Sequence, residues 1–189
     1  MMEMLGARVA KLRPHCKVLV LSNPFSKAAG VFDEKSQYES AGIDGLRKGL
    51  GPGAEVTVVF PEVRPEYFTH RESIVIPPDS RTPLSFVIRP EAVDQLAGAH
   101  PECNVIVSLI GLPAGVQQLK IWSEKDPRSF ALLLPDLRLL GSPAEVAAAF
   151  GREKILAAVF QDPTSGQPLL VTRENIEELL AKTPKEIGY

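Results

Sequence analysis

The run Asn-Val-Ile-Val-Ser-Leu-Ile-Gly-Leu-Pro, residues 104–113, constrains the fold of this chain more than any other stretch. Both of its alternating faces are apolar, which is typical of a strand covered by helices on two sides. Its one polar interruption, Ser108, comes close to the end of the strand, where open α/β sheets bind their ligands. Residues 104–113 therefore predict the central strand of a parallel sheet, with a functional carboxyl end.

Four further apolar runs predict strands that alternate with helical patterns. The strands are expected at residues 17–22, 55–60, 129–134 and 154–160, and the helices at about 33–50, 90–98, 114–122, 142–151 and 172–182. A proline follows each strand closely, and proline cannot donate a ladder hydrogen bond. This alternation predicts a three-layer, flavodoxin-like α/β domain. We expect a mostly parallel five-stranded sheet, order 2-1-3-4-5, with helices on both faces.

Three segments are expected along the chain. Residues 1–16 predict an N-terminal helix and lead-in, residues 17–182 a single α/β domain, and residues 183–189 a tail. The 189 residues, of which 44% are hydrophobic and 23% charged, suit one such domain. Within it, residues 61–82 are irregular apart from a short edge strand expected at 73–76. Loops of this length without regular structure are uncommon unless they have a function or are mobile.

The charge of the chain limits its partners. A formal net charge of −2 argues against nucleic acid, because phosphate binding needs a basic surface. No apolar run is long enough to span a bilayer, and the first residues lack a signal-peptide core. The sequence as given predicts a cytoplasmic protein. If a membrane anchor upstream of Met1 was removed or missed, the domain is extracytoplasmic instead.

Known cofactor and nucleophile motifs are missing from the sequence. Neither Gly-x-x-x-x-Gly-Lys-Ser/Thr nor Gly-x-Gly-x-x-Gly occurs, so we expect no cofactor. Gly-x-Ser-x-Gly is missing too, which argues against an α/β-hydrolase. Asp136 and Asp162 follow neighbouring strands and offer a carboxylate pair, but aspartates beside proline more often form turns. We assign no catalytic residue and no metal ligand.

Two cysteines precede neighbouring strands of the predicted sheet. Cys16 comes directly before the first strand and Cys103 directly before the third. Three interpretations remain open. The thiols are buried and free, they form a disulfide outside the cytoplasm, or they bind zinc together with His15 and His100.

The predicted strand order places a crevice between the first and third strands, at their carboxyl ends. Ser26 and Lys27 in the loop after the first strand suit an anionic or hydroxylated ligand. The candidate ligand-binding residues around the crevice are Asn23, Ser26, Lys27, Ser108, Gly111, Asp136 and Asp162.

Three stretches carry a resemblance to a known family. Residues 17–50 contain a strand, Asn-Pro-Phe-Ser, and a helix ending in Gly-Leu-Arg-Lys-Gly-Leu. Together with residues 103–113 and 154–163, they resemble one lobe of a type I periplasmic binding protein. Proteins of that family are two-lobed clamps for sugars, amino acids or other small solutes, whereas this chain has strands for one lobe.

The resemblance implies non-catalytic recognition of a small molecule or of a partner protein. Two alternatives stand beside it. One is an enzyme with its site in the same crevice, using Asp136 and Asp162 or the loop with Ser26 and Lys27. The other is a structural subunit, tethered at its amino terminus, that contacts a partner through residues 61–82.

Overall fold

The structure is a computed structural model that describes residues 1–26, 34–183, 187 and 189. These residues form one six-stranded sheet, in the order β2-β1-β3-β4-β5-β6. The first five strands are mutually parallel, and β6 is antiparallel to β5. The strands are β1 (Lys17–Leu21), β2 (Glu55–Val59), β3 (Val105–Ser108), β4 (Ser129–Leu133), β5 (Ile155–Gln161) and β6 (Pro168–Val171).

The predicted order 2-1-3-4-5 is confirmed, but the predicted count of five strands was one too low. The additional strand, β6, pairs through Pro168 with Gln161 at the edge of the sheet. Because proline lacks an N–H, it favours an edge position, and so short a run carries little strand pattern of its own. The hairpin turn before it is closed by the side chain of Asp162, which accepts hydrogen bonds from the backbone nitrogens of Thr164 and Ser165.

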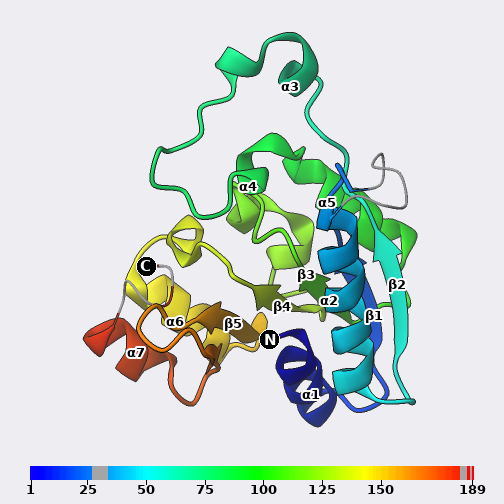
Figure 1. Cartoon of the computed structure of the whole chain (residues 1–189), viewed down its shortest axis with the longest axis vertical. Coiled ribbons are helices and arrows are strands. Elements are labelled where there is room, and N and C mark those ends of the chain that lie inside the picture. The colour runs from blue at the N-terminus through cyan, green and yellow to red at the C-terminus, as the bar shows by residue number, and fades with distance from the viewer. Residues whose placement is uncertain (27–33, 184–186, 188) are drawn as a thin grey trace.

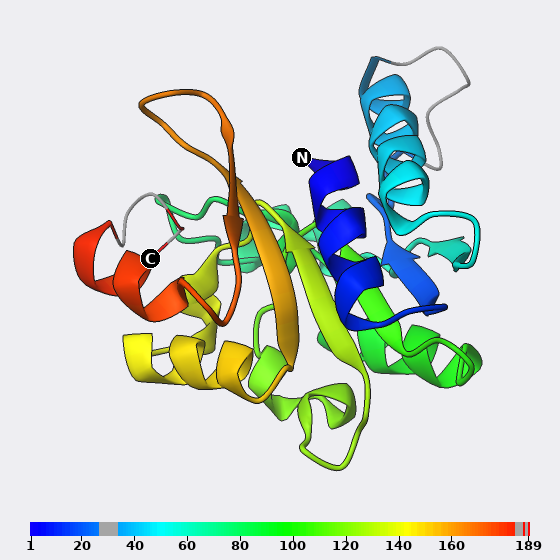
Figure 2. The ribbon, with the colours of Figure 1, turned by 90° about the horizontal axis from the view of Figure 1, so that it is seen from below.

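Helices cover both faces of the sheet, which confirms the three-layer prediction. α1 and α2 lie on one face, and α5, α6 and α7 lie on the other (Figures 1 and 2). The helices are α1 (Met2–Leu12), α2 (Glu34–Leu50), α3 (Glu66–Thr69), α4 (Leu84–Val87), α5 (Pro90–Ala99), α6 (Pro143–Gly151) and α7 (Ile176–Lys182). Short 3₁₀ helices are η1 (Arg71–Ser73), η2 (Val116–Gln118), η3 (Lys120–Trp122) and η4 (Leu137–Leu140). No helix among the described residues is long and apolar enough to cross a membrane.

The central strand β3 is buried along its whole length, as its apolar pattern predicts. Val105 and Val107 pack on the side of α1 and α2, and Ile106 packs on the side of α5 and α6. Each fully buried aliphatic side chain of this kind contributes about 1.5–3 kcal/mol through its removal from water.

The N-terminal helix α1 packs against the sheet and against α2. Leu5 and Val9 are fully buried in the same core cluster as β1. Two glycines permit a close approach of the helices. A Cβ atom at Gly6 would lie 2.5 Å from the carbonyl oxygen of Leu46, and one at Gly49 would lie 2.1 Å from that of Glu3. The lead-in helix therefore shares the core of the α/β domain.

Several local predictions were wrong for identifiable reasons. The helix expected at 114–122 is replaced by η2 and η3, because Gly115 has a φ of 78° and Asp94 accepts hydrogen bonds from the backbone nitrogens of Lys120 and Ile121. Residues 73–76 form no strand. The last helix begins at Ile176, since Thr172 instead opens a turn stabilised by Asn175. By contrast, the capping box of α6 is confirmed.

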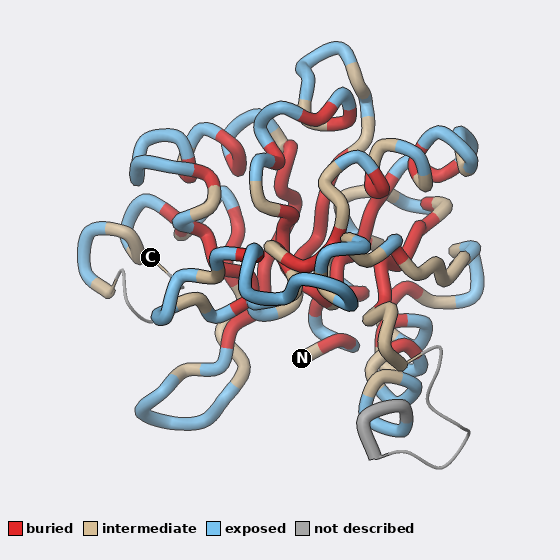
Figure 3. Tube along the Cα trace, turned by 90° about the horizontal axis from the view of Figure 1, so that it is seen from above, coloured by how far each residue is buried: buried red, intermediate tan, exposed pale blue. Residues whose placement is uncertain are grey.

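Residues 61–82 form an arm that leaves the carboxyl end of β2 and extends beyond the edge of the sheet (Figure 1). Within the arm, α3 and η1 are the regular elements, and Val63 makes an isolated bridge to Ile88. Much of the arm is exposed (Figure 3). The arm therefore stands on the edge of the sheet where the sequence predicts a ligand crevice.

Candidate ligand-binding site

Two adjoining cavities lie where β1, β3 and β4 end. The first has a volume of about 320 Å³ and lies beside α1 and α2, and the second, of about 200 Å³, lies beside α4. Leu109 and Leu133 line both cavities, so the two are separated by one apolar wall. The first cavity is completed by Met2, Asn23, Tyr38, Glu39 and Gly42, and the second by Arg81, Thr82, Pro83, Leu84, Ile110, Gly111 and Leu134.

The carboxylate of Glu39 is the polar centre of the first cavity. Its Oε1 atom accepts a hydrogen bond from the backbone nitrogen of Asn23 at 2.6 Å and another from the hydroxyl group of Ser22. Its Oε2 atom has no partner among the residues that the structure describes. Since Glu39 lines the cavity, this second oxygen can, as far as the described residues are concerned, accept a hydrogen bond from a ligand hydroxyl group.

Aromatic side chains join the loop after β1 to the arm. The rings of Phe25 and Tyr67 lie 5.2 Å apart, and those of Tyr67 and Phe68 lie 5.4 Å apart at nearly a right angle. The guanidinium group of Arg71 lies 4.9 Å from the centre of the Tyr67 ring. Such pairs contribute about 0.5–1.5 kcal/mol each beyond their buried area. The arm is therefore anchored at the loop that follows β1.

The second cavity depends on a close approach at Gly111. Gly111 has a φ of 80°, and a Cβ atom there would lie 2.8 Å from Cγ2 of Thr82. A glycine meets both requirements, because it adopts positive φ without strain and has no side chain to clash. The base of the arm can therefore reach the turn after β3.

Solved structures with the same fold are solute-binding proteins. A carbohydrate transporter from Acidothermus cellulolyticus, in complex with myo-inositol, is 13% identical, with a TM-score of 0.55 over 98% of this chain and 60% of that one. An ABC transporter periplasmic solute-binding protein from Actinobacillus succinogenes, with bound D-allose, is 11% identical, with a TM-score of 0.55 over 94% and 60% of the two chains.

A third such structure is an ABC transporter solute-binding protein from Burkholderia graminis, in complex with D-arabinose. It is 14% identical, with a TM-score of 0.54 over 92% of this chain and 60% of that one. The chain has the fold of a periplasmic binding-protein lobe. This confirms the resemblance that the sequence suggested, and the chain spans about 60% of the length of these proteins. No family model and no curated protein matches the sequence.

Several of the predicted site residues shape the loops of this lobe. The side chain of Asn23 accepts a hydrogen bond from the backbone nitrogen of Phe25, and the Ser26 hydroxyl group donates to the carbonyl oxygen of Asn23. Ser108 is fully buried, and its hydroxyl group donates to the carbonyl oxygen of Gly111. Asn23 and Gly111 also line the cavities. Lys27 lies outside the described residues.

The two predicted aspartates belong to separate hydrogen-bond networks. Asp136 is buried and accepts hydrogen bonds from Nε and Nη2 of Arg138, at 2.8 and 2.7 Å. Burial raises the pKa of Asp136, but the hydrogen bonds and charge of Arg138, together with the backbone donor of Arg81, lower it by more, so the net shift is downward. The backbone donors of Ser165 and Thr164 lower the pKa of Asp162, which is half-buried in the hairpin turn. A general acid needs a raised pKa, so this pair is unsuited to acid–base catalysis.

Cys16 and Cys103 are free, buried thiols in this structure. Their strands are neighbours as predicted, but the two side chains belong to core clusters on opposite faces of the sheet. Burial raises the pKa of both thiols. The described residues contain no group of three or more histidine, cysteine or acidic side chains that could hold a metal ion. The geometry favours the first of the three interpretations, two free thiols.

The sequence did not reveal the role of Glu39. A glutamate on an amphipathic helix is ordinarily a solvated side chain, and nothing local distinguishes it from its neighbours. Its importance comes from the packing of α2, which places it against the loop after β1.

Proposed function

We propose that this chain binds a small polyhydroxylated molecule, without catalysing a reaction, at the carboxyl edge of the sheet. The observation that carries the proposal is the pair of adjoining cavities with the Glu39 carboxylate in one of them. The position is the one at which open α/β sheets bind ligands, next to the reversal of strand order between β1 and β3.

The chemistry of the first cavity suits a sugar-like ligand. A carboxylate accepts strong hydrogen bonds from hydroxyl groups, worth about 1.5–3 kcal/mol each. Leu109 and Leu133 offer apolar surface for the C–H faces of such a molecule. The solved structures of the same fold hold myo-inositol, D-allose and D-arabinose, which supports this class of ligand.

The size of the site predicts modest affinity. A volume of about 320 Å³ is at the lower end of the range for small-molecule sites, which is roughly 300–1,000 Å³. One lobe leaves part of a bound ligand in water, whereas a two-lobed clamp encloses it. We therefore expect a dissociation constant on the order of 0.1 mM, or about −5.5 kcal/mol.

Titration calorimetry with myo-inositol, D-allose and D-arabinose tests this function. At least one of the three should bind the wild-type chain, and Glu39→Gln should weaken binding at least ~10-fold, about 1.4 kcal/mol. Glutamine keeps an oxygen for Ser22 and Asn23, so the loop is preserved. Glu177→Gln, on the exposed side of α7, is the matched control and should bind like the wild type. Failure of all three compounds to bind at ~10 mM would reject the proposal.

Self-association through the arm is a second candidate function, favoured by two exposed apolar side chains. Phe68 is 70% exposed and Val75 is 82% exposed. The arm also carries both Arg64 and Glu72, so two copies related by a two-fold axis can pair opposite charges. We propose that the partner at this surface is a second copy of the chain.

Light scattering at ~100 µM protein tests this second function. The wild-type chain should have the mass of a dimer, and Phe68→Ser combined with Val75→Ser should reduce it to that of a monomer. Met4→Ser, which alters an exposed apolar residue on α1, should leave the dimer intact. A monomeric wild-type chain would reject self-association without affecting the ligand-binding proposal.

A further inference from the structure

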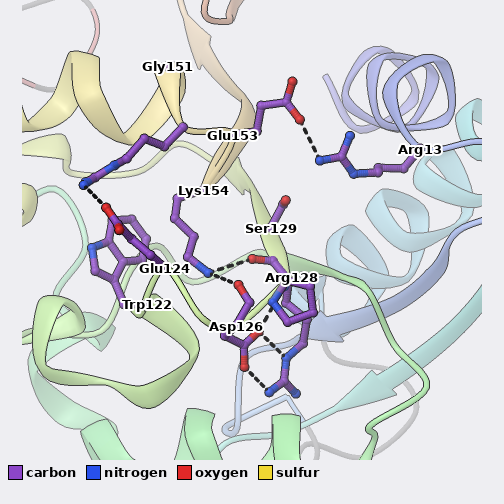
Figure 4. Close-up of a pocket in the computed structure, with 11 residues that line it drawn as sticks. Arg13, Trp122, Glu124, Asp126, Arg128, Ser129, Gly151, Glu153 and Lys154 are labelled. Atoms are coloured by element: carbon purple, nitrogen blue, oxygen red, sulfur yellow. Dashed lines mark hydrogen bonds and ion pairs between the residues drawn. The ribbon is translucent and has the colours of Figure 1, made fainter.

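A larger cavity, of about 590 Å³, lies at the opposite edge of the sheet, beside the amino ends of β4 and β5 (Figure 4). Arg13 after α1, Trp122 of η3, Ser129 at the start of β4 and Lys154 just before β5 lie around it. We propose that this cavity binds a small oxyanion, namely the phosphate or carboxylate group of a small molecule. This site is distinct from the ligand site at the carboxyl edge.

Lys154 supplies a buried positive charge. The residue is 6% exposed, and its Nζ donates to the carbonyl oxygens of Ile121, Asp126 and Arg128, at 2.8, 2.7 and 3.1 Å. These three bonds use all the donors of the ammonium group, and none of them is to a carboxylate. The ammonium group is thus fixed beside the cavity without an ionic partner in direct contact (Figure 4).

The charged side chains around the cavity leave an excess of positive charge. Glu153 is shared by Arg13 at 2.7 Å and Arg173 at 3.1 Å, so one carboxylate faces two guanidinium groups. The other ion pairs are one to one, Arg152 with Glu124 and Arg128 with Asp126. The residues that line the cavity thus include four cationic groups, on Arg13, Arg128, Arg152 and Lys154, and three carboxylates. The excess is notable because the whole chain has a net charge of −2.

Ser129 supplies an unused hydroxyl group at the same place. The residue is 2% exposed and lines the cavity, and its hydroxyl group has no hydrogen-bond partner among the described residues. In Figure 4 this hydroxyl group points to the side of the cavity where Arg13 lies. The Oγ atom is open to the cavity and is not enclosed in the core, because it is not among the buried side-chain atoms that lack a partner. An oxyanion in the cavity would accept its hydrogen bond.

Arg13 and Arg152, which line the cavity, also have N–H donors that no other described residue uses. Arg13 uses Nη2 for Glu153 and Nη1 for the carbonyl oxygen of Leu12, and Arg152 uses Nη1 for Glu124. A guanidinium group has five N–H donors arranged to bind phosphate or carboxylate oxygens in pairs. The cavity therefore favours an anion over a neutral ligand. It offers guanidinium donors that the described residues leave unused, the hydroxyl group of Ser129 and the fixed ammonium group of Lys154.

Tryptophan fluorescence can report on this cavity selectively, because Trp122 is the single tryptophan of the sequence and lines it. The full chain is titrated with inorganic phosphate and, separately, with succinate, at ionic strength held constant with sodium chloride. We expect a saturable change in emission with at least one of them, and the one that binds identifies the anion class. Ser129→Ala and Arg13→Gln should each weaken the apparent affinity at least ~5-fold, about 1 kcal/mol.

Two controls separate this site from general charge effects and from the carboxyl-edge site. Arg47→Gln removes an exposed guanidinium group on α2 that pairs with Asp44, and it should leave the titration unchanged. Glu39→Gln should also leave it unchanged. The proposal is overturned if sodium chloride alone reproduces the change, if Arg47→Gln weakens binding as much as Arg13→Gln, or if Ser129→Ala folds normally and binds like the wild type. A saturable response to D-allose and none to either anion also overturns it.

Discussion

The Oε1 atom of Glu39 lies 2.6 Å from the backbone nitrogen of Asn23, and this hydrogen bond ties the start of α2 to the loop after β1. The same oxygen accepts a hydrogen bond from the hydroxyl group of Ser22, a residue that is itself buried. One side chain therefore fixes the edge of the sheet at which the first cavity forms. The stability of this edge and its binding chemistry depend on the same carboxylate.

Replacing Glu39 with alanine should lower the free energy of unfolding. The change leaves the Ser22 hydroxyl group and the Asn23 N–H without their acceptor, at a cost of about 1–3 kcal/mol. Urea unfolding followed by circular dichroism measures it. Glu177→Ala, on the exposed surface of α7, should change stability by less than about 0.5 kcal/mol. Equal effects of the two variants would show that the Glu39 contacts contribute nothing.

Gly111→Ala and Gly115→Ala form a matched pair. Both glycines have nearly the same φ, 80° and 78°, so each substitution carries a similar backbone strain of about 1–2 kcal/mol. A Cβ atom at Gly115 would meet nothing within 4 Å, whereas one at Gly111 would lie 2.8 Å from Thr82. Gly111→Ala should therefore be the more destabilising in urea. Equal losses of stability in the two variants would mean that residues 82–85 shift to accommodate the new Cβ atom at no cost, and that the close contact at Gly111 is unimportant.

Asp136 should contribute to stability in a pH-dependent way. Its folded pKa is lower than its unfolded value of about 3.9, so its stabilisation is present above about pH 5 and is lost as the pH falls through the lower folded pKa. Asp136→Asn should lower the free energy of unfolding by about 1–3 kcal/mol at pH 7. Its difference in free energy of unfolding from the wild type should shrink below about pH 4. Unfolding curves from pH 7 to pH 2 measure this. A difference in free energy of unfolding that stays constant over that range would contradict the lowered pKa. Asp44→Asn, at an exposed site, serves as the control.

Both cysteines should be free and protected. Burial raises the pKa of each thiol, and the thiolate is the reactive form. Ellman's reagent should detect little reaction in the native protein and two thiols after denaturation without reductant. Detection of no thiol after denaturation would instead indicate a disulfide, which requires the two side chains to leave their separate clusters.

The strands and their order could be predicted from the sequence, because their apolar patterns are strong and the connections between parallel strands are restricted. The Ser142 capping box produced the expected helix start, and the apolar run of residues 104–113 produced the expected central strand, although β3 covers only Val105–Ser108. By contrast, η2 and η3 depend on Asp94, which lies on another helix, and β6 depends on pairing with β5. Tertiary contacts of this kind leave no local pattern.

The candidate site was predicted less completely than the fold. Its place at the carboxyl edge followed from the strand order. The residue types, however, did not reveal which side chains use their hydrogen-bonding groups within their own loops and so are not free to bind a ligand. Ser26 and Ser108 satisfy their hydroxyl groups within their own turns, and Asp162 closes a hairpin. Glu39, which offers an open oxygen, carried no distinguishing pattern in the sequence.

Chemical-shift mapping by NMR tests the central claim most directly. The ¹⁵N-labelled chain is titrated with the compound that binds best among myo-inositol, D-allose and D-arabinose. The account predicts that the largest shifts occur at the backbone amides of Asn23, Glu39, Leu109 and Gly111, around the two adjoining cavities. The amides of Ser129 and Lys154, at the opposite edge, should not shift. Largest shifts at Ser129 and Lys154, or no shifts with any of the three compounds, would contradict a sugar-like ligand site at the carboxyl edge.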